Sequence, residues 1–258
     1  MKFSLERFRK LKEQSFGWIN ATQFFGALND NVFKAFVQMF IIAKLVNVKS
    51  AVPLSIATIM FSLPFLLFTA YAGFLADRFS KKIVVVALKY AELAIMVLGI
   101  VAFLVGSPIM LYILLFLMST QSALFSPTKY SIVPEIVEHS KLARANSVLV
   151  TFSFLAIILG SAMAPVVAKI STFFLPSTEQ LGENYAYAIA QILCLLIAVA
   201  GILTSHRVLT MRPADPEMRP DWLFPRKMLQ TWRWVRQDRE LRLLIMGNIL
   251  FSASAAFL

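Results

Sequence analysis

The sequence predicts an all-α polytopic membrane protein, and three observations support this prediction. Of the 258 residues, 59% are hydrophobic and only 15% are charged, whereas water-soluble domains carry about 25% charged residues. Apolar stretches of nearly 20 residues recur along the chain, and a helix of about that length crosses a bilayer core. The alternating segments of about ten residues that are typical of membrane β-strands are absent from the sequence. Helices are therefore expected, because a helix satisfies its own backbone hydrogen bonds in lipid.

The apolar stretches predict six complete membrane spans, which form a bundle over residues 16–205, and the start of a seventh span. The expected spans cover residues 16–43, 52–76, 83–105, 109–133, 147–170 and 185–205, and the seventh covers residues 241–258. Residues 1–15 are polar and basic. We expect this N-terminal segment to be retained, because the apolar segment after it is too long for the core of a signal peptide.

Lysine and arginine residues indicate how the spans are oriented. Nineteen of them precede the first span or lie in the gaps after spans two, four and six: Lys2, Arg7, Arg9, Lys10, Lys12, Arg78, Lys81, Lys82, Lys141, Arg144, Arg207, Arg212, Arg219, Arg226, Lys227, Arg233, Arg236, Arg239 and Arg242. The gaps on the opposite side hold only Lys44, Lys49 and Lys169. Positive charge marks the cytoplasmic side of a membrane, so the N-terminus is expected to be cytoplasmic. Because the basic residues lie between apolar segments, no nucleic-acid partner is expected despite the net charge of +11.

The segment 206–240 is the one long polar stretch and is expected to be a cytoplasmic linker. Its first part, Met211–Pro220, contains three prolines and is predicted to be non-helical. In its second part, apolar side chains recur at helical spacing among basic residues, at Met228, Leu229, Trp232 and Val235. This pattern predicts an amphipathic helix on the inner leaflet, where basic residues meet anionic lipid. An ordinary solvated basic linker is the alternative.

The gap after the second span has the sequence GFLADRFSKK, from Gly73 to Lys82. Gly73 has no side chain and permits the close approach of another helix. The carboxylate of Asp77 can accept hydrogen bonds from a helix N-terminus, where the helix dipole favours negative charge. We expect the basic side chains of Arg78, Lys81 and Lys82 to lie at the inner leaflet. A basic loop that only sets the topology is the simpler interpretation of the same residues.

This motif resembles the cytoplasmic signature of the major facilitator superfamily, in which a glycine usually stands where this sequence has Ser80. Its position between the second and third spans, on the predicted cytoplasmic side, agrees with the resemblance. The resemblance implies the major facilitator fold, in which two six-helix halves rock about a midplane site, and this chain would be the N-terminal half. It also implies that the motif is a gate that latches the halves in the outward-facing state. The expected gate residues are Gly73, Asp77, Arg78, Lys81 and Lys82.

Two further stretches resemble a narrower branch of that superfamily. The first is QFFGALNDNVFK in span one, residues 23–34, and the second is QSALFSPTKYSIVPE at the end of span four, residues 121–135, followed by KLARAN at 141–146. Both resemble the lysophospholipid transporters, including members fused to a glycerophospholipid acyltransferase. This resemblance implies a bacterial inner-membrane protein that moves lysophosphatidylethanolamine-type lipids inward for re-acylation. The implied partners are the lysophospholipid, membrane lipids, a C-terminal transporter half and a fused or associated acyltransferase, and no cofactor is implied.

Span one contains a polar turn at its middle. Asp30 costs about 3 kcal/mol on insertion scales if it faces lipid near the midplane, and Asn29 and Asn31 add to this cost. The turn is therefore expected to face protein or water. Asp30 and Lys34 are four residues apart on one helix face, which permits an ion pair. A carboxylate near an ammonium can meet a zwitterionic head group, while binding of a proton or sodium, or a structural polar cluster, are the alternatives.

Other polar residues within the spans extend the list of candidates. Lys129 and Tyr130 lie where span four leaves the membrane, so the lysine either reaches the lipid phosphate layer or holds a substrate phosphate. The family resemblance favours the second interpretation, and it adds Gln23 from the span-one stretch to the expected substrate contacts. In span three, Lys89 and Glu92 are three residues apart and are expected either to pair within the helix or to act in transport. In span five, small residues at Gly160, Ala164 and Ala168 predict a helix-packing seam.

Other function classes are compared on the same residues. An exporter of drugs or other amphiphiles needs the same apolar cavity with few charges, so span composition does not separate it from a lysophospholipid transporter. An enzyme is not expected, because a glycerolipid acyltransferase needs His-x4-Asp, whereas Arg144 follows His139 and Met211 follows His206 at that spacing. The single cysteine, Cys194, excludes a cysteine-based metal site, and no metal is expected. A membrane scaffold leaves Asp30 and the gate motif without a role.

Overall fold

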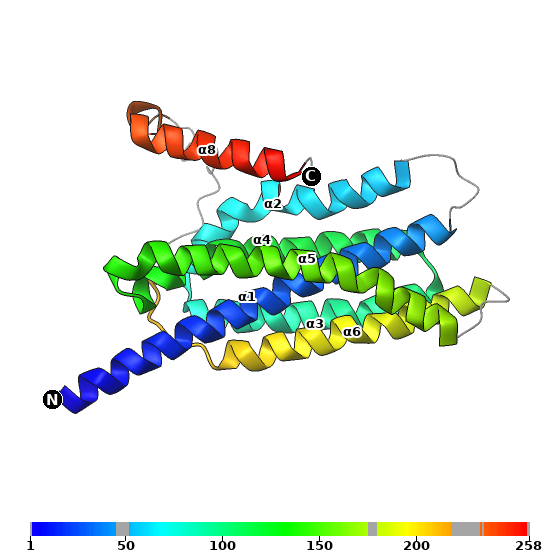
Figure 1. Ribbon diagram of the computed structural model, residues 1–258, viewed down its shortest axis with the longest axis horizontal. Helices are drawn as coiled ribbons and strands as arrows, with labels where there is room; N and C mark the ends of the chain where they lie inside the picture. Colours follow the sequence, from blue (N-terminus) through cyan, green and yellow to red (C-terminus); the bar gives the residue numbers. More distant parts are fainter. Residues whose placement is uncertain (1, 45–51, 175–179, 218–232, 234, 257–258) are drawn as a thin grey trace. The chain divides into compact units, whose positions relative to one another are not determined.

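The computed structural model describes residues 2–44, 52–174, 180–217, 233 and 235–256, and the regular elements among them are all helical (Figure 1). The helices are α1 (Lys2–Lys44), α2 (Val52–Arg78), α3 (Lys81–Val105), α4 (Pro108–Ile136), the short 3-10 helix η1 (His139–Lys141), α5 (Leu142–Phe174), α6 (Gln180–His206) and α8 (Arg239–Ala256). The prediction of an all-α chain is confirmed for the described residues.

The chain divides into two compact units. The first unit, Met1–Met218, holds α1 to α6, and the second, Arg219–Leu258, holds α8. Helix α8 covers the segment that was expected to begin a seventh span, and this assignment stays a prediction. The part of the expected amphipathic helix around Met228 and Trp232 lies outside the described residues.

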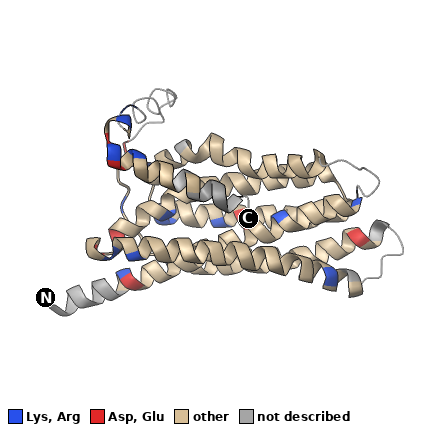
Figure 2. Cartoon of the chain, turned by 45° about the horizontal axis from the view of Figure 1, so that its top comes forward, with Lys and Arg blue, Asp and Glu red and all other residues tan. Residues whose placement is uncertain are grey.

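In the part of the chain that the structure describes, five helices are long and apolar enough to cross a membrane, with candidate spans Val52–Thr69, Lys81–Val105, Pro108–Ile136, His139–Ser171 and Gly182–His206. These correspond to the predicted spans two to six. Helix α1, as far as the structure describes it, is long enough but less apolar than these five helices. Its middle carries the polar turn and Lys34, which lower its mean hydropathy. Figure 2 shows that most charged residues of the bundle lie toward the helix ends. Helix α1 begins at Lys2, so the basic N-terminal segment continues the first helix instead of preceding it as a separate element.

Helix α1 occupies the centre of the first unit, which explains how it accommodates polar residues. It packs against α2, α4, α5 and α6 and runs obliquely between α5 and α6 (Figure 1). The ring of Phe40 is fully buried and lies 5.3 Å from the rings of both Phe103 and Tyr187, in edge-to-face contacts. Such contacts contribute about 0.5–1.5 kcal/mol beyond burial. They fix α1 against α3 and α6, roughly three helical turns from Asp30.

Helix α5 packs against α1 at Gly160, and the small residues that follow on the same face of α5 are buried. Ala164 and Ala168 are buried, and a Cβ atom placed on Gly160 would lie 2.8 Å from the carbonyl oxygen of Leu28. A side chain at this position would therefore push the two helices apart. The predicted helix-packing seam is confirmed, and it holds α5 close to the polar turn of α1.

Candidate functional site

Among the buried ionisable side chains that the structure describes, three lie close together inside the first unit. Asp30 on α1 is 8% exposed, while Lys89 and Glu92 on α3 are 1% and 0% exposed. Ionisable groups in membrane helices are costly, and they commonly mark substrate or ion pathways. These residues and their neighbours are therefore the candidate functional site.

Lys89 and Glu92 form an ion pair along one turn of α3, with Nζ and Oε2 2.5 Å apart. The intrahelical pair considered from the sequence is thus present. The second oxygen of Glu92, Oε1, accepts a hydrogen bond of 2.7 Å from Nδ2 of Asn29 on α1. A Cβ atom on Gly26 would lie 2.5 Å from the Lys89 ammonium, and one on Gly201 would lie 3.3 Å from its Cδ. Glycines on α1 and α6 therefore leave the space that the buried lysine occupies.

Asp30 is held by α4. The hydroxyl of Ser122 donates a hydrogen bond of 2.6 Å to Oδ2 of Asp30, and Nε2 of Gln121 donates one of 2.9 Å to the Ser122 hydroxyl. Within the described part of the chain, Oδ1 of Asp30 and Oε1 of Gln121 are buried without a hydrogen-bond partner. A buried oxygen without a donor costs free energy, so these atoms can accept hydrogen bonds from a ligand.

Lys129 on α4 provides a second ammonium at the site. Its Nζ donates a hydrogen bond of 3.1 Å to Oε1 of Gln23 on α1, and the hydroxyl of Ser153 on α5 donates one of 3.1 Å to the same oxygen. Nε2 of Gln23 donates to the carbonyl oxygen of Leu149 over 2.7 Å. Gln23 therefore joins α1, α4 and α5 and fixes the position of the Lys129 ammonium.

A cavity of about 270 Å³ lies among α1, α2, α4 and α5, and Lys89 reaches it from α3. Its polar lining includes Gln23, Asp30, Asn31, Lys89, Gln121, Ser122, Lys129 and Ser153, and its apolar lining includes Phe61, Phe65 and Phe125. A carboxylate and two ammonium groups thus face an aromatic wall. This arrangement can bind the head group of an amphiphile that carries charges of both signs.

The structure brings Gln23, Asp30, Asn31 and Lys129 to the cavity lining, out of the seven substrate contacts expected from the sequence. The other three do not line it. Asn29 is turned toward Glu92. Tyr130 is 44% exposed, with its ring centre 5.0 Å from the ammonium of Lys129.

Lys34 also lies away from the cavity lining. Its ammonium is 4.6 Å from the ring centre of Phe61, and among the described residues no ion pair joins it to Asp30. The ion pair that the spacing of Asp30 and Lys34 permits is therefore not formed between the two described side chains. Spacing along one helix permitted the contact, but Ser122 on α4 takes the Asp30 carboxylate instead.

Sequence reasoning did not identify Gln121, Ser122 or Ser153 as site residues. Ser122, Phe125 and Lys129 follow one another at intervals of three and four residues, which places them on one face of α4. That spacing, inside the span-four stretch, is the signal that identifies Ser122. Ser153 lies in an apolar run with no comparable signal.

The residues expected to form a gate lie around the turn between α2 and α3. Lys81 is only 3% exposed, and its ammonium forms an ion pair with Glu135 of α4. The expectation that this lysine lies at the lipid leaflet is therefore wrong, since the start of α3 turns it toward α4. The guanidinium carbon of Arg78 lies 5.5 Å and 5.6 Å from the ring centres of Phe74 and Phe79, and Lys82 is half-buried.

Gly73 and Asp77 lie in the last two turns of α2. A Cβ atom on Gly73 would meet no atom within 4 Å, so none of the described residues makes the close approach that this glycine permits. Within the same residues, the carboxylate of Asp77 accepts no hydrogen bond, but its backbone carbonyl accepts one of 2.9 Å from the amide of Asp215. The hydroxyl of Ser80 donates one of 2.8 Å to the carbonyl of Met211. The segment 211–215 therefore lies against the α2–α3 turn.

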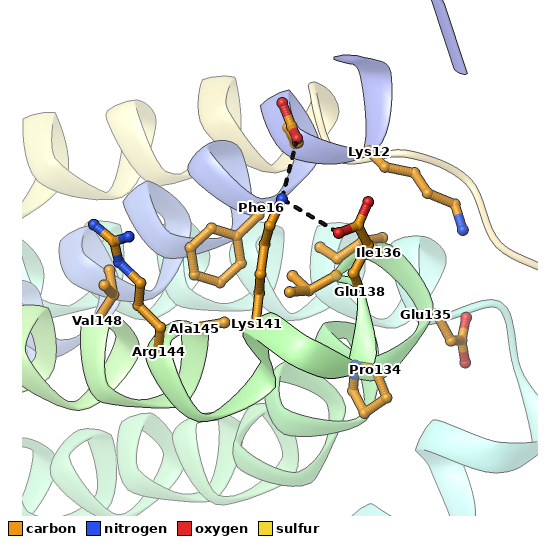
Figure 3. A pocket seen from close by; sticks show the side chains of 12 residues that line it. Lys12, Phe16, Pro134, Glu135, Ile136, Glu138, Lys141, Arg144, Ala145 and Val148 are labelled. Atoms are coloured by element: carbon orange, nitrogen blue, oxygen red, sulfur yellow. Dashed lines mark ion pairs between the residues drawn. The ribbon is translucent and has the colours of Figure 1, made fainter. Parts of the chain in front are cut away.

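A larger hollow of about 450 Å³ lies between the ends of α1, α4 and α5 (Figure 3). Lys141 forms ion pairs there with Glu138 over 3.3 Å and with Glu13 over 4.0 Å, and all three side chains are more than half exposed. Exposed pairs of this kind contribute about 0–1 kcal/mol. We therefore place the candidate site in the smaller cavity, where the charged side chains of Asp30 and Lys89 are buried.

Comparison with known proteins supplies a family and two similar proteins. The Major Facilitator Superfamily profile matches residues 19–258. The lysophospholipid transporter LplT of Pectobacterium carotovorum subsp. carotovorum (strain PC1) is 27% identical over 245 residues, which are 93% of this chain and 54% of that protein. This chain thus spans about half the length of that relative. The in meso crystal structure of the POT family transporter PepTSo matches with a TM-score of 0.56 at 18% identity, over 81% of this chain and 40% of that one. The fold expected from the motif after span two is therefore confirmed.

Proposed function

Because this chain belongs to the major facilitator superfamily of membrane transporters, we propose that it is the N-terminal half of a lysophospholipid transporter whose head-group site is the cavity around Asp30. The proposal includes a bacterial inner membrane, inward movement of the lipid, and a C-terminal half that completes the transport path. Re-acylation by a fused or associated acyltransferase would follow inside the cell.

The observation that carries the proposal is the presence of opposite charges in one cavity. Oδ1 of Asp30 has no partner among the described residues and is available to the ammonium of a zwitterionic head group. The ammonium of Lys129 lines the same cavity and is available to the phosphate. Two unit charges 4 Å apart attract by about 4 kcal/mol at an effective dielectric constant of about 20, so both contacts favour binding.

The dimensions of the cavity also fit a head group. Its volume of about 270 Å³ lies just below the range of roughly 300–1,000 Å³ for small-molecule sites. A whole lysophospholipid is too large for this space, so its acyl chain would extend beyond the cavity along apolar surface. The aromatic side chains of Phe61 and Phe65 line the cavity and provide such a surface where the chain would leave.

The similarity to a lysophospholipid transporter supports the substrate class. Nineteen lysine and arginine residues lie on the same predicted side of the membrane as the N-terminus, and only three lie on the opposite side. This distribution supports a cytoplasmic N-terminus. Export of drugs or other amphiphiles is the competing function, and the uptake experiment separates the two.

The test is uptake of labelled lysophosphatidylethanolamine by spheroplasts that express the full-length protein. Wild type is compared with Asp30→Asn and with Glu183→Gln, a control carboxylate near the start of α6, at matched membrane expression. Uptake that requires the gene, falls at least about tenfold in Asp30→Asn and persists in Glu183→Gln is the expected result. Uptake unchanged in Asp30→Asn would remove Asp30 from the site, and absence of gene-dependent uptake would overturn the substrate class.

A further inference from the structure

The charged side chains around the cavity balance one another. Among the described residues, the ionisable side chains that line it are Asp30, Lys89 and Lys129, and Glu92 is ion-paired with Lys89. The carboxylate of Asp30 interacts electrostatically with Glu92, Lys89 and Lys129. In the described part of the chain, two carboxylates and two ammonium groups therefore give this side of the site a formal net charge of zero.

Stability does not explain why Lys89 and Glu92 are charged. Their side chains are 2% and 1% exposed, and the removal of each ion from water costs several kcal/mol. Apolar residues of similar volume are often equally or more stabilising at such positions. The fold nevertheless leaves room for the lysine beside Gly26 and Gly201. The pair is thus built into the helix packing next to the cavity, which indicates a role there.

Glu92 is fixed beside Lys89 by its two partners. One oxygen contacts the Lys89 ammonium and the other accepts a hydrogen bond from Asn29. Because both oxygens are occupied and the residue is fully buried, its charge stays beside Lys89. Removal of that charge with retention of shape would leave the Lys89 ammonium uncompensated at the cavity wall. A second free ammonium, in addition to Lys129, strengthens the binding of an anion in a site of low dielectric constant.

We propose that Glu92 determines charge selectivity, so that the cavity prefers net-neutral head groups to net-negative ones. Its carboxylate cancels the charge of Lys89, which leaves Asp30 and Lys129 to meet the ammonium and phosphate of a zwitterionic head group. A head group with a phosphate and no ammonium leaves Asp30 facing negative charge, and repulsion between like charges disfavours it. This inference rests on the function proposed above and adds the residue that sets its head-group preference.

The experiment measures uptake of two labelled lipids by spheroplasts that express the full-length protein. One is zwitterionic lysophosphatidylethanolamine and the other is lysophosphatidylglycerol, which carries a net negative charge. Glu92→Gln retains the side-chain volume and an oxygen that accepts from Asn29, and it is expected to raise the ratio of lysophosphatidylglycerol to lysophosphatidylethanolamine uptake about tenfold. Lys89→Met is expected to lower this ratio, and the double variant, in which charges balance again, is expected to return it to the wild-type value.

The ratio of the two uptake rates distinguishes a change in head-group selectivity from a general loss of folded protein. An unchanged ratio in Glu92→Gln, with equal loss of both lipids at matched expression, would overturn the inference and leave Glu92 a packing residue. If Glu92→Gln does not accumulate in the membrane, Lys89→Met and the double variant decide the question through the opposite shift and its reversal. Failure of wild type to take up either lipid would instead overturn the proposed function, and the inference with it.

Discussion

The ammonium of Lys81, the first residue of α3, forms an ion pair with the carboxylate of Glu135 near the end of α4. The Lys81 side chain is 4% exposed and that of Glu135 is 35% exposed. Nζ of Lys81 also lies 3.4 Å from the carbonyl oxygen of Ser131 and donates to it. The motif that resembles a gate is therefore connected to α4 inside the first unit.

Loss of this ion pair is expected to destabilise the protein. Breaking a fully buried pair costs about 3–5 kcal/mol and an exposed pair about 0–1 kcal/mol, so Lys81→Ala should cost about 2 kcal/mol. The melting temperature of the purified full-length protein in detergent is the measurement. Lys82→Ala is the matched control, since Lys82 is half-buried and forms no ion pair among the described residues. Equal melting temperatures for the two variants would contradict the structural role of Lys81.

Gly160→Ala is expected to weaken the contact between α5 and α1. The added Cβ would lie 2.8 Å from the carbonyl oxygen of Leu28 and 3.0 Å from Cβ of Asn31, and overpacking of this kind costs about 1–3 kcal/mol. Gly17→Ala, where a Cβ meets no atom within 4 Å, should be neutral or slightly stabilising because alanine favours helix. Thermal unfolding of both variants is the measurement, and a Gly160→Ala protein as stable as wild type would refute the close approach.

Lys129 and Lys34 are expected to differ in their effect on uptake. Lys129→Gln removes an ammonium that lines the cavity, and loss of a hydrogen bond to a charged group costs about 1.5–3 kcal/mol. We expect the KM for lysophosphatidylethanolamine to rise at least about tenfold. Lys34→Gln removes an ammonium that lies over Phe61, and the KM of this variant for the same lipid should change less than about threefold. Initial uptake rates over a range of lipid concentrations give both values, and the reverse order would exclude Lys129 from the site.

The predicted orientation is testable with single cysteines and a membrane-impermeant maleimide. Lys141 and Lys169 are both exposed and lie on opposite sides in the predicted topology, whereas Cys194 is fully buried. In a full-length protein without other reactive cysteines, intact spheroplasts should label Lys169→Cys and not Lys141→Cys, because the reagent reaches only the outer side. After disruption of the spheroplasts, the maleimide should label both cysteine variants. Labelling of Lys141→Cys in intact spheroplasts would show that the orientation is the reverse of the predicted one.

Several predictions that depend on one segment at a time agree with the structure. The helices α2 to α6 occur where apolar stretches of membrane-spanning length were found. The seam at Gly160 followed from small residues at intervals of four, and the Lys89–Glu92 pair followed from a spacing of three. In each case, the helical period alone determines which side chains share a face.

Predictions of the partners of individual charged side chains were less successful. The spacing within α1 permitted an ion pair between Asp30 and Lys34, yet the partner of Asp30 is Ser122, 92 residues later in the chain. Lys81 was expected at the lipid surface, yet it meets Glu135, 54 residues later. Neither partner follows from a helical period, because each depends on which faces of two helices meet.

The sequence by itself determined that this chain forms membrane helices, in what order they occur, and which superfamily motif follows the second one. Apolar length, charge and local spacing are properties of short segments, and the cost of exposing polar backbone to lipid leaves helices as the expected structure. Only the tertiary structure decided that Glu92 meets Asn29 across 63 residues and that Lys89 reaches the cavity of Asp30. Those contacts exist because α1 packs centrally, where the partners of a buried charge come from neighbouring helices.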